Sequence, residues 1–189
     1  MILTESLGWN WSMEMLLWLL PIVFFLHDGE EIATMERWVR SNKDNPSLSS
    51  ISSVRIRWDK NLTFSFTFAV LVLGLVLSSV TWHAAVRYEA AGSTPFLYAG
   101  FVAVFLLDGI KHVGATMLTR KYTPGVITAA LLEIPFGAYA LYNLFHLKMI
   151  DLPALALGLA IAVPVTLFLV WSGLTLGMRL APVRNMPFE

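Results

Sequence analysis

Five stretches of mostly apolar residues, each long enough to cross a bilayer, constrain this chain more than any other feature. A transmembrane helix needs about 20 such residues, and the stretches cover 13–35, 62–82, 96–118, 124–147 and 152–178. Only 14% of the residues are charged, whereas a soluble domain has about 25%. We therefore expect an all-α fold: a single polytopic membrane domain, a bundle of five transmembrane helices.

Lysine and arginine are unequally distributed among the connections between these stretches. Arg87 and Lys148 lie on one side of the predicted membrane. Ten such residues lie on the other side: Arg37, Arg40, Lys43, Arg55, Arg57, Lys60, Arg120, Lys121, Arg179 and Arg184. Positive residues favour the cytoplasmic side, so the sequence predicts an outside N-terminus and a cytoplasmic C-terminus. The polar, serine-rich segment 41–60 is then a cytoplasmic loop.

The first apolar stretch contains a polar cluster that reads His-Asp-Gly-Glu-Glu from His27 to Glu31. Charge inside a membrane costs a few kcal/mol per group and usually marks an ion path, a relay or a catalytic site. On a helix, His27, Glu30 and Glu31 are spaced i, i+3 and i+4 and share one face. That face presents an imidazole and two carboxylates.

Polar residues on other stretches lie at a matching depth. With a rise of ~1.5 Å per residue, six side chains fall roughly 5–16 Å inside the cytoplasmic end of their helices: His27, Glu30, Glu31, Asp108, His112 and Glu133. His83 and His146 fall near the opposite surface and are expected outside this group. The sequence therefore predicts one constellation shared by three helices.

Two histidines with several carboxylates form a donor set that suits Zn²⁺, Fe²⁺ or Mn²⁺. The chain has no cysteine, which excludes thiolate sites and disulfides. We expect a divalent metal, zinc before iron or manganese, bound by His27, His112 and Glu31, with Glu30 as a further ligand.

The remaining polar residues receive supporting roles. Glu30, Glu31 or Glu133 is the candidate base that accepts a proton from water, and Asp108 is expected to orient a histidine from behind. Arg120 and Tyr122 follow at the cytoplasmic boundary, where they either bind an anionic head group near the site or anchor the helix.

The motif at His27, Glu30 and Glu31 resembles the His-x-x-Glu-Glu signature of the HXXEE-domain family of small bacterial integral membrane proteins. A second block, 112–128 with Arg-Lys-Tyr-Thr-Pro-Gly inside it, is similar to that family's second block. Asp108 stands where the family pattern has asparagine, and the His-x-x-x-Arg element ascribed to the family is absent. The resemblance implies a multi-pass protein of the bacterial cytoplasmic (inner) membrane with its site at these residues.

Together these features favour a metal-dependent membrane hydrolase that acts on a lipid or another hydrophobic small molecule in the cytoplasmic half of the bilayer. The alternatives are a metal-dependent isomerase, cyclase or oxidase, a proton- or ion-coupled transporter, and a scaffold in which the polar groups hold helices together. The net charge is +0 without a basic tract, so a nucleic-acid partner is not expected. An oligomer is compatible with the sequence.

Overall fold

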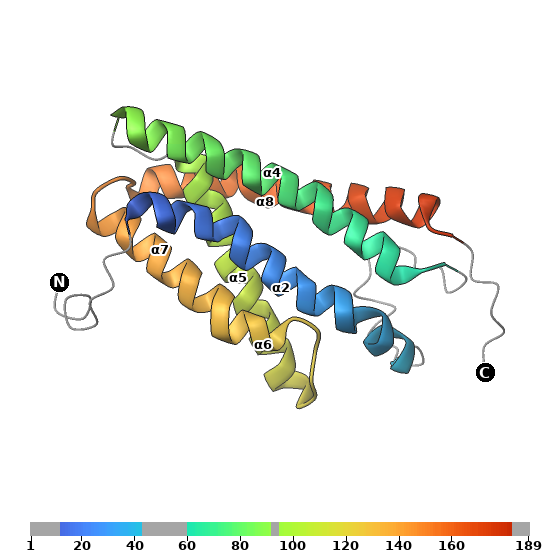
Figure 1. Ribbon diagram of the computed structural model, residues 1–189. Coiled ribbons are helices and arrows are strands. Elements are labelled where there is room, and N and C mark those ends of the chain that lie inside the picture. The colour runs from blue at the N-terminus through green and yellow to red at the C-terminus, as the bar shows by residue number, and fades with distance from the viewer. Residues whose placement is uncertain (1–11, 43–59, 92–94, 183–189) are drawn as a thin grey trace.

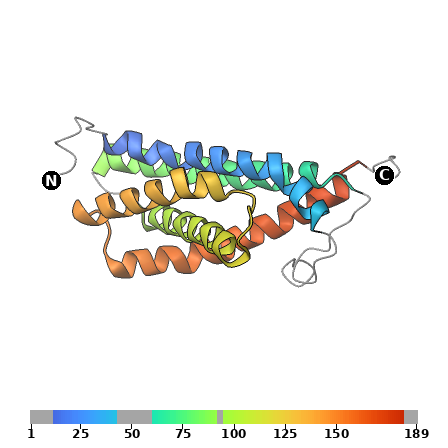
Figure 2. The same cartoon turned by 90° about the horizontal axis from the view of Figure 1, so that it is seen from below.

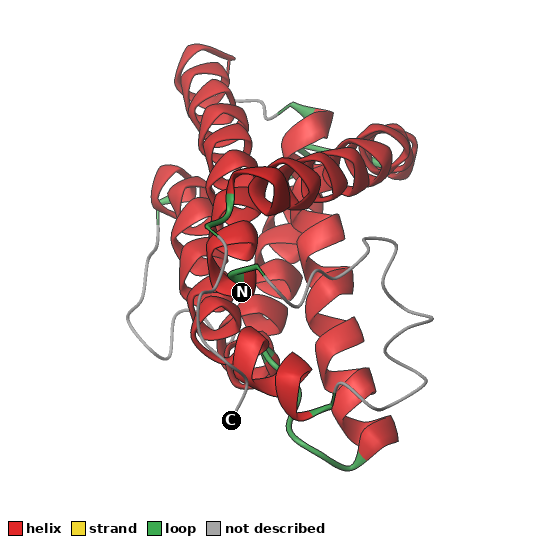
Figure 3. Cartoon of the chain, turned by 90° about the vertical axis from the view of Figure 1, so that its right-hand side faces the viewer, coloured by secondary structure: helices red, strands yellow, loops and turns green. Residues whose placement is uncertain are grey.

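The computed structural model describes residues 12–42, 60–91 and 95–182, and within these ranges the chain is helical without a β-strand (Figure 3). Helix α2 spans Met13–Ser41, α4 Leu62–Ala91, α5 Phe96–Thr119 and α8 Leu152–Leu180. The segment between α5 and α8 is continuous but changes type: α6 covers Val126–Thr128, a π-helical turn η1 covers Ala129–Glu133, and α7 covers Ile134–His146. The expected all-α fold of five long helical segments is confirmed (Figure 1).

The helix ends follow from local side chains. The Ser12 hydroxyl accepts a hydrogen bond from the Met15 N–H at 3.2 Å and caps α2, as N-terminal serines commonly do. At its other end α2 continues beyond the expected residue 35, because Glu36 and Val39 still face the interior. Helix α4 continues past 82 through a stretch rich in the good helix former alanine.

Four of the five segments are long and apolar enough to cross a membrane: α4, α5, Val126–His146 and α8. Helix α2 is outside this group because Asp28, Glu30 and Glu31 interrupt its apolar run. The described part of the chain therefore has the character of a membrane protein. Its least apolar long helix carries the conspicuous polar motif.

Helices α4 and α8 run side by side, and α2 lies between α4 and the α6–α7 segment (Figure 1). Helix α5 crosses between α8 and the α6–α7 segment (Figure 2). The close approach of α4 and α8 depends on Gly173 and Gly177. A Cβ at Gly173 would lie 2.7 Å from the Ala69 Cα, and one at Gly177 would lie 2.7 Å from the Ser65 carbonyl oxygen.

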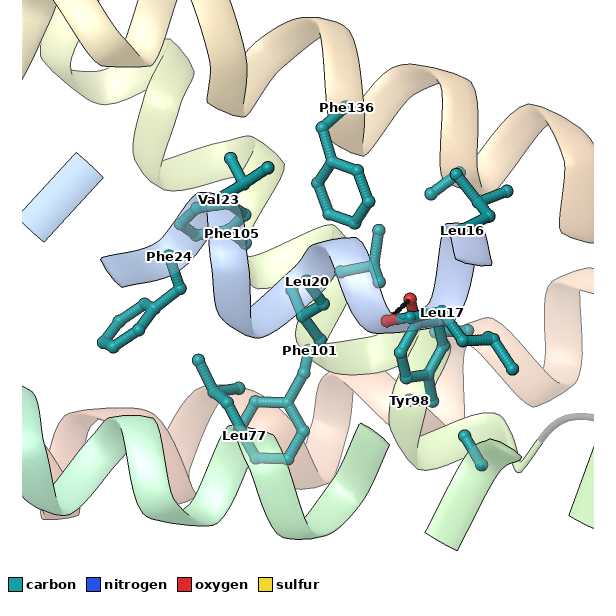
Figure 4. Packing of buried hydrophobic residues seen from close by; sticks show 14 of the residues in the cluster. Leu16, Leu17, Leu20, Val23, Phe24, Leu77, Tyr98, Phe101, Phe105 and Phe136 are labelled. Carbon is teal, nitrogen blue, oxygen red and sulfur yellow. Dashed lines mark hydrogen bonds between the residues drawn. The ribbon is translucent and has the colours of Figure 1, made fainter. Parts of the chain in front are cut away.

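The interior is a cluster of apolar side chains from α2, α4, α5 and α7 (Figure 4). Leu17 and Leu20 of α2 are completely buried, and the buried Tyr98 hydroxyl donates a hydrogen bond to the Leu17 carbonyl at 3.1 Å. One helical turn further, Phe24 continues the same face, and His27 follows with its ring 6.0 Å from that of Phe105. The core-facing side of α2 therefore changes from apolar to polar without leaving the interior.

At one end of the bundle, Arg40 and Lys60 join the ends of three helices, and Arg179 lies in the last turn of α8. Arg40 at the end of α2 donates to the Lys60 carbonyl at 3.4 Å, and the Lys60 ammonium donates to the Ala181 carbonyl at 2.5 Å. These contacts bring together the end of α2, the start of α4 and the end of α8. Most of the predicted loop 41–60 lies outside the described residues.

Candidate metal centre

The polar half of α2 directs its side chains toward α5. His27, Asp28 and Glu31 are buried, with 2%, 9% and 8% of their surface exposed. They continue the i, i+3, i+4 face that buries leucines and phenylalanine earlier in the helix. Burial of ionisable side chains is costly unless they have partners. The partners of His27 and Glu31 come from α5 and the segment after it.

Helix α5 supplies Asp108 and His112, one turn apart. The Asp108 Oδ2 atom lies 3.1 Å from His112 Nε2 and 3.9 Å from His27 Nε2, and the two imidazole rings are 4.9 Å apart. One ligand atom from each of these residues lies within 4.8 Å of the other two. The structure thus brings together His27, His112 and Asp108. From the sequence, Asp108 is expected in the constellation, but behind a histidine rather than among the metal ligands.

The backbone places a proton on Nδ1 of His112. Its Nδ1 lies 2.8 Å from the carbonyl oxygen of Pro124, and a carbonyl can only accept a hydrogen bond. The Nδ1 atom of His112 therefore carries a proton. The Nε2 atom lies 3.1 Å from Asp108 Oδ2 and 3.4 Å from a Glu31 oxygen. Because carboxylates only accept hydrogen bonds, Nε2 faces them either as the second N–H of an imidazolium or as an unprotonated ligand of a cation.

The contact with Thr128 places a proton on Nδ1 of His27 as well. The Thr128 hydroxyl donates to Glu30 Oε2 at 2.7 Å, so toward His27 Nδ1, 3.1 Å away, it acts as acceptor. His27 therefore carries its proton on Nδ1, and its buried Nε2 has no hydrogen-bond partner among the described residues. The Nε2 atoms of both histidines lie close to the Asp108 carboxylate, at 3.9 Å for His27 and 3.1 Å for His112.

The loop that follows α5 closes over both imidazoles at Gly125. This residue has φ +83, and a Cβ there would lie 2.9 Å from His27 Cε1 and 3.1 Å from His112 Cε1. Glycine adopts this conformation without steric cost. No larger side chain would leave the two rings in place.

Glu30 does not contribute to the cluster. Its carboxylate accepts hydrogen bonds from the Thr128 N–H at 2.8 Å, the Thr128 hydroxyl at 2.7 Å, the Tyr122 hydroxyl at 2.7 Å and the Ile127 N–H at 3.3 Å. The expectation of Glu30 as a ligand or base is therefore at odds with the observed geometry, because donors from the loop after α5 and from α6 occupy both of its oxygens. The Glu30 carboxylate lies at the N-terminus of α6, which is favourable for an anion.

Tyr122 contacts Glu30, to which its hydroxyl donates, rather than the histidine cluster. Partial burial, together with the neighbouring Glu30 carboxylate, raises the pKa of the Tyr122 phenol, so its hydroxyl stays protonated and donates. The Tyr122 carbonyl in turn accepts from the Trp38 indole N–H at 3.0 Å. Arg120, in contrast, is exposed, and its backbone adopts the left-handed conformation at the end of α5.

Glu133 reaches the site through the π-helical turn η1. The Ile134 N–H bonds to the Ala129 carbonyl five residues back, and Pro135, which lacks an N–H, follows directly. Glu133 is fully buried, neither of its oxygens has a hydrogen-bond partner among the described residues, and Oε2 lies 3.4 Å from His27 Nδ1. Glu133 therefore lies on the Nδ1 side of the His27 imidazole. A base for bound water would lie on the Nε2 side, where the cavity is.

Glu31 is the carboxylate that faces the open side. Together with His27, Asp28 and Asp108 it lines a cavity of about 340 Å³ between α2, α4, α5 and α8. Lys111, also at this cavity, pairs with the outer oxygen of Asp108 at 2.5 Å. The two remaining histidines are exposed: His146 stacks on Tyr142, and His83 lies on the outer part of α4.

Three site residues were not identified as such from the sequence. Thr128 and the Pro124 carbonyl hold the two Nδ1 atoms, and Asp28 lines the cavity. Asp28 lies in the His-Asp-Gly-Glu-Glu motif and Thr128 in the block 112–128. Their helical spacing alone does not predict which side chains they contact. Only the path of the loop after α5 reveals what they touch.

The fold and the site define a class of protein. It is a helical protein of membrane character, with a buried cluster of histidines and carboxylates shared by α2, α5 and η1. The family model described as "Protein of unknown function with HXXEE motif" matches residues 18–140, a range that contains the whole cluster. The chain belongs to this family. It is also similar to the uncharacterized protein YrkK of Bacillus subtilis (strain 168), with 24% identity over 127 residues that cover 66% of this chain and 72% of that protein. No solved structure matches the chain.

Proposed function

We propose that this protein is a metal-dependent enzyme of the bacterial inner membrane that hydrolyses a lipid or another hydrophobic small molecule. The observation that carries the proposal is the convergence of His27 Nε2, His112 Nε2 and an Asp108 oxygen within 4.8 Å. Both imidazoles are held at Nδ1, so each Nε2 is available to a cation. A cation beside Asp108 would replace the proton that the 3.1 Å contact between His112 Nε2 and the Asp108 carboxylate otherwise requires.

The chemistry of the donors selects the cation. Nitrogen and oxygen donors without a thiolate suit zinc, iron or manganese. Ligands of one tetrahedral zinc lie about 3.4 Å apart, given bonds of about 2.1 Å. The Asp108–His112 and Asp108–His27 distances, 3.1 Å and 3.9 Å, bracket that value. All three ligand atoms lie within 4.8 Å of one another, so the donors of one ion are already gathered in one place.

The surrounding residues can then be given roles. Glu31, at the edge of the cluster and on the cavity wall, is the proposed acceptor of a proton from the attacking water. Thr128, the Pro124 carbonyl and Glu133 orient the imidazoles, as partners behind histidine ligands commonly do. A divalent cation at this place supplies Lewis acidity toward a substrate carbonyl.

The membrane placement is part of the proposal. We propose that all five long helical segments span the bilayer, α2 included, because its charged residues face the interior rather than lipid. The basic residues gathered at the ends of α2 and α8 and the start of α4 support a cytoplasmic location for that end. The N-terminus is then outside and the C-terminus in the cytoplasm.

Metal analysis of the purified protein tests the proposal. We expect about one equivalent of zinc, iron or manganese in the wild type and a loss of at least tenfold in His27→Ala combined with His112→Ala. His146→Ala, a histidine exposed elsewhere in the fold, is the matched control and should retain the metal. A wild-type protein without stoichiometric metal, or a double variant that keeps it, contradicts the proposal.

A proton-coupled transporter is the second candidate, and Glu133 is the observation that favours it. A fully buried carboxyl with no hydrogen-bond partner among the described residues suits a proton relay across a membrane. Proton flux in proteoliposomes that depends on Glu31 and Glu133, in protein without bound metal, would favour this function over hydrolysis.

A further inference from the structure

We propose that the ligand of this site is an amphiphile with a single alkyl chain, held with its head group at the His27 cluster and its chain in the adjoining cavity. The inference rests on the proposed function, since it names the substrate class of the same site. It is carried by the shape and chemistry of the cavity walls rather than by the metal donors.

The cavity has a polar side and an apolar side. Helices α2 and α5 supply its ionisable groups, whereas α4 and α8 supply only apolar side chains apart from Thr166. Along α2 the lining changes from Phe24 to His27, and along α5 from Phe105 to Asp108. The cavity therefore changes from apolar to polar within one turn of each helix. An amphiphile has the same division between its apolar chain and its polar head group.

The size of the cavity favours one chain over two. Its volume of about 340 Å³ is near the lower end of the roughly 300–1,000 Å³ found for small-molecule sites. Lipid tails already lie in apolar surroundings, so the apolar walls select by size and shape rather than by removing the chain from water.

The polar groups at the cavity indicate an oxygen-bearing head group. Lys111, on Asp108, is a hydrogen-bond donor for a carboxylate or ester oxygen. The buried Thr166 hydroxyl lines the same cavity from α8 and has no hydrogen-bond partner among the described residues. These donors, with a cation at the cluster, match a fatty acid or a single-chain ester.

Photolabelling with a fatty acid that carries a diazirine at the chain end tests the inference. In zinc-loaded protein in nanodiscs, we expect the label on cavity residues of α4 and α8, such as Leu73 and Val170. Leu73→Trp fills the cavity and should reduce labelling at least tenfold. Leu71→Trp, two residues away on the same helix where the leucine is 52% exposed, is the matched control and should leave the labelling unchanged.

A second variant covers the case in which Leu73→Trp does not fold. Val170→Phe narrows the cavity from α8, and in competition with the label it should shift the preference from hexadecanoate toward decanoate. Equal labelling of wild type and Leu73→Trp, a label spread over outward positions such as Leu71, or an unchanged chain preference in Val170→Phe would overturn the inference.

Zinc content, measured on the same samples, separates this inference from the proposed function. Leu73→Trp should retain its zinc, because Leu73 lies on α4 and the donors lie on α2 and α5. Cavity labelling in a protein that binds no zinc would refute the metal proposal and support the cavity. Stoichiometric zinc without cavity labelling would refute the cavity and leave the metal centre standing.

Discussion

Gly125→Ala should weaken metal binding, because the added methyl group would meet both imidazoles. A Cβ at Gly125 would lie 2.9 Å from His27 Cε1 and 3.1 Å from His112 Cε1, whereas ordinary contacts begin near 3.4 Å. The rings must therefore retreat by about 0.5 Å and 0.3 Å, the differences between these distances. Displacements of about 0.5 Å impair a preorganised site, and loss of support behind metal ligands typically costs 10–100-fold in affinity.

The backbone adds a separate cost to this substitution. Residue 125 has φ +83, and a left-handed conformation costs a residue with a Cβ roughly 1–2 kcal/mol. We expect Gly125→Ala to lower the free energy of unfolding by that amount in mixed micelles even without metal. The two effects are separable, because one depends on metal concentration and the other does not.

Competition with a chelator of known affinity gives the metal dissociation constant, and Gly29→Ala provides the control. Gly29 lies within the His-Asp-Gly-Glu-Glu motif itself, yet a Cβ there meets nothing within 4 Å. In a helix, alanine is favoured over glycine by about 1 kcal/mol, so Gly29→Ala should keep its metal and gain stability. If Gly125→Ala binds zinc as tightly as Gly29→Ala, the loop does not position the imidazoles as argued.

Three further substitutions separate the orientation of the histidines, the chemistry and the packing. Thr128→Val removes the acceptor for His27 Nδ1 and should weaken zinc binding about 10–100-fold by chelator competition; unchanged affinity would exclude the orienting role. Glu31→Gln should keep the metal and lower ester hydrolysis about 10²–10⁴-fold; loss of zinc would instead make Glu31 a ligand. Tyr98→Phe removes the buried hydrogen bond to Leu17 and should lower the free energy of unfolding by about 1 kcal/mol, measured in mixed micelles; an equal loss of zinc would contradict the separation of core and site.

Hydrophobic length and helical rise predict the five helices and the meeting of His27 with residues of α5. Helix length and the depth of each side chain along its helix depend only on the residue count and the constant rise per residue. The proximity of Asp108 to His112 also follows from their spacing of i, i+4. What the sequence does not settle is whether Asp108 lies behind an imidazole or beside it, because that depends on the rotation of α5 against α2.

The distinction between Glu30 and Glu31 could not be predicted for a similar reason. Both lie within one turn of His27, and only the loop after α5 decides that Glu30 caps the next helix while Glu31 faces the cavity. The path of that loop is set by Gly125 and by the contacts of Thr128. These are tertiary features without a periodic signal.

The π-helical turn at Ala129–Glu133 amounts to one surplus residue wound into an otherwise regular helix. A π-helical turn closes its hydrogen bonds one residue further along the chain than an α-helical turn, so excising one residue would restore ordinary winding while the flanking helices keep their relative orientation. The change would fall on the turn itself, where Glu133 would lose the extra residue that sets its position relative to Thr128 and His27. Sequences of relatives aligned over this stretch should accordingly reveal a one-residue gap wherever the carboxylate behind the imidazole has been given up.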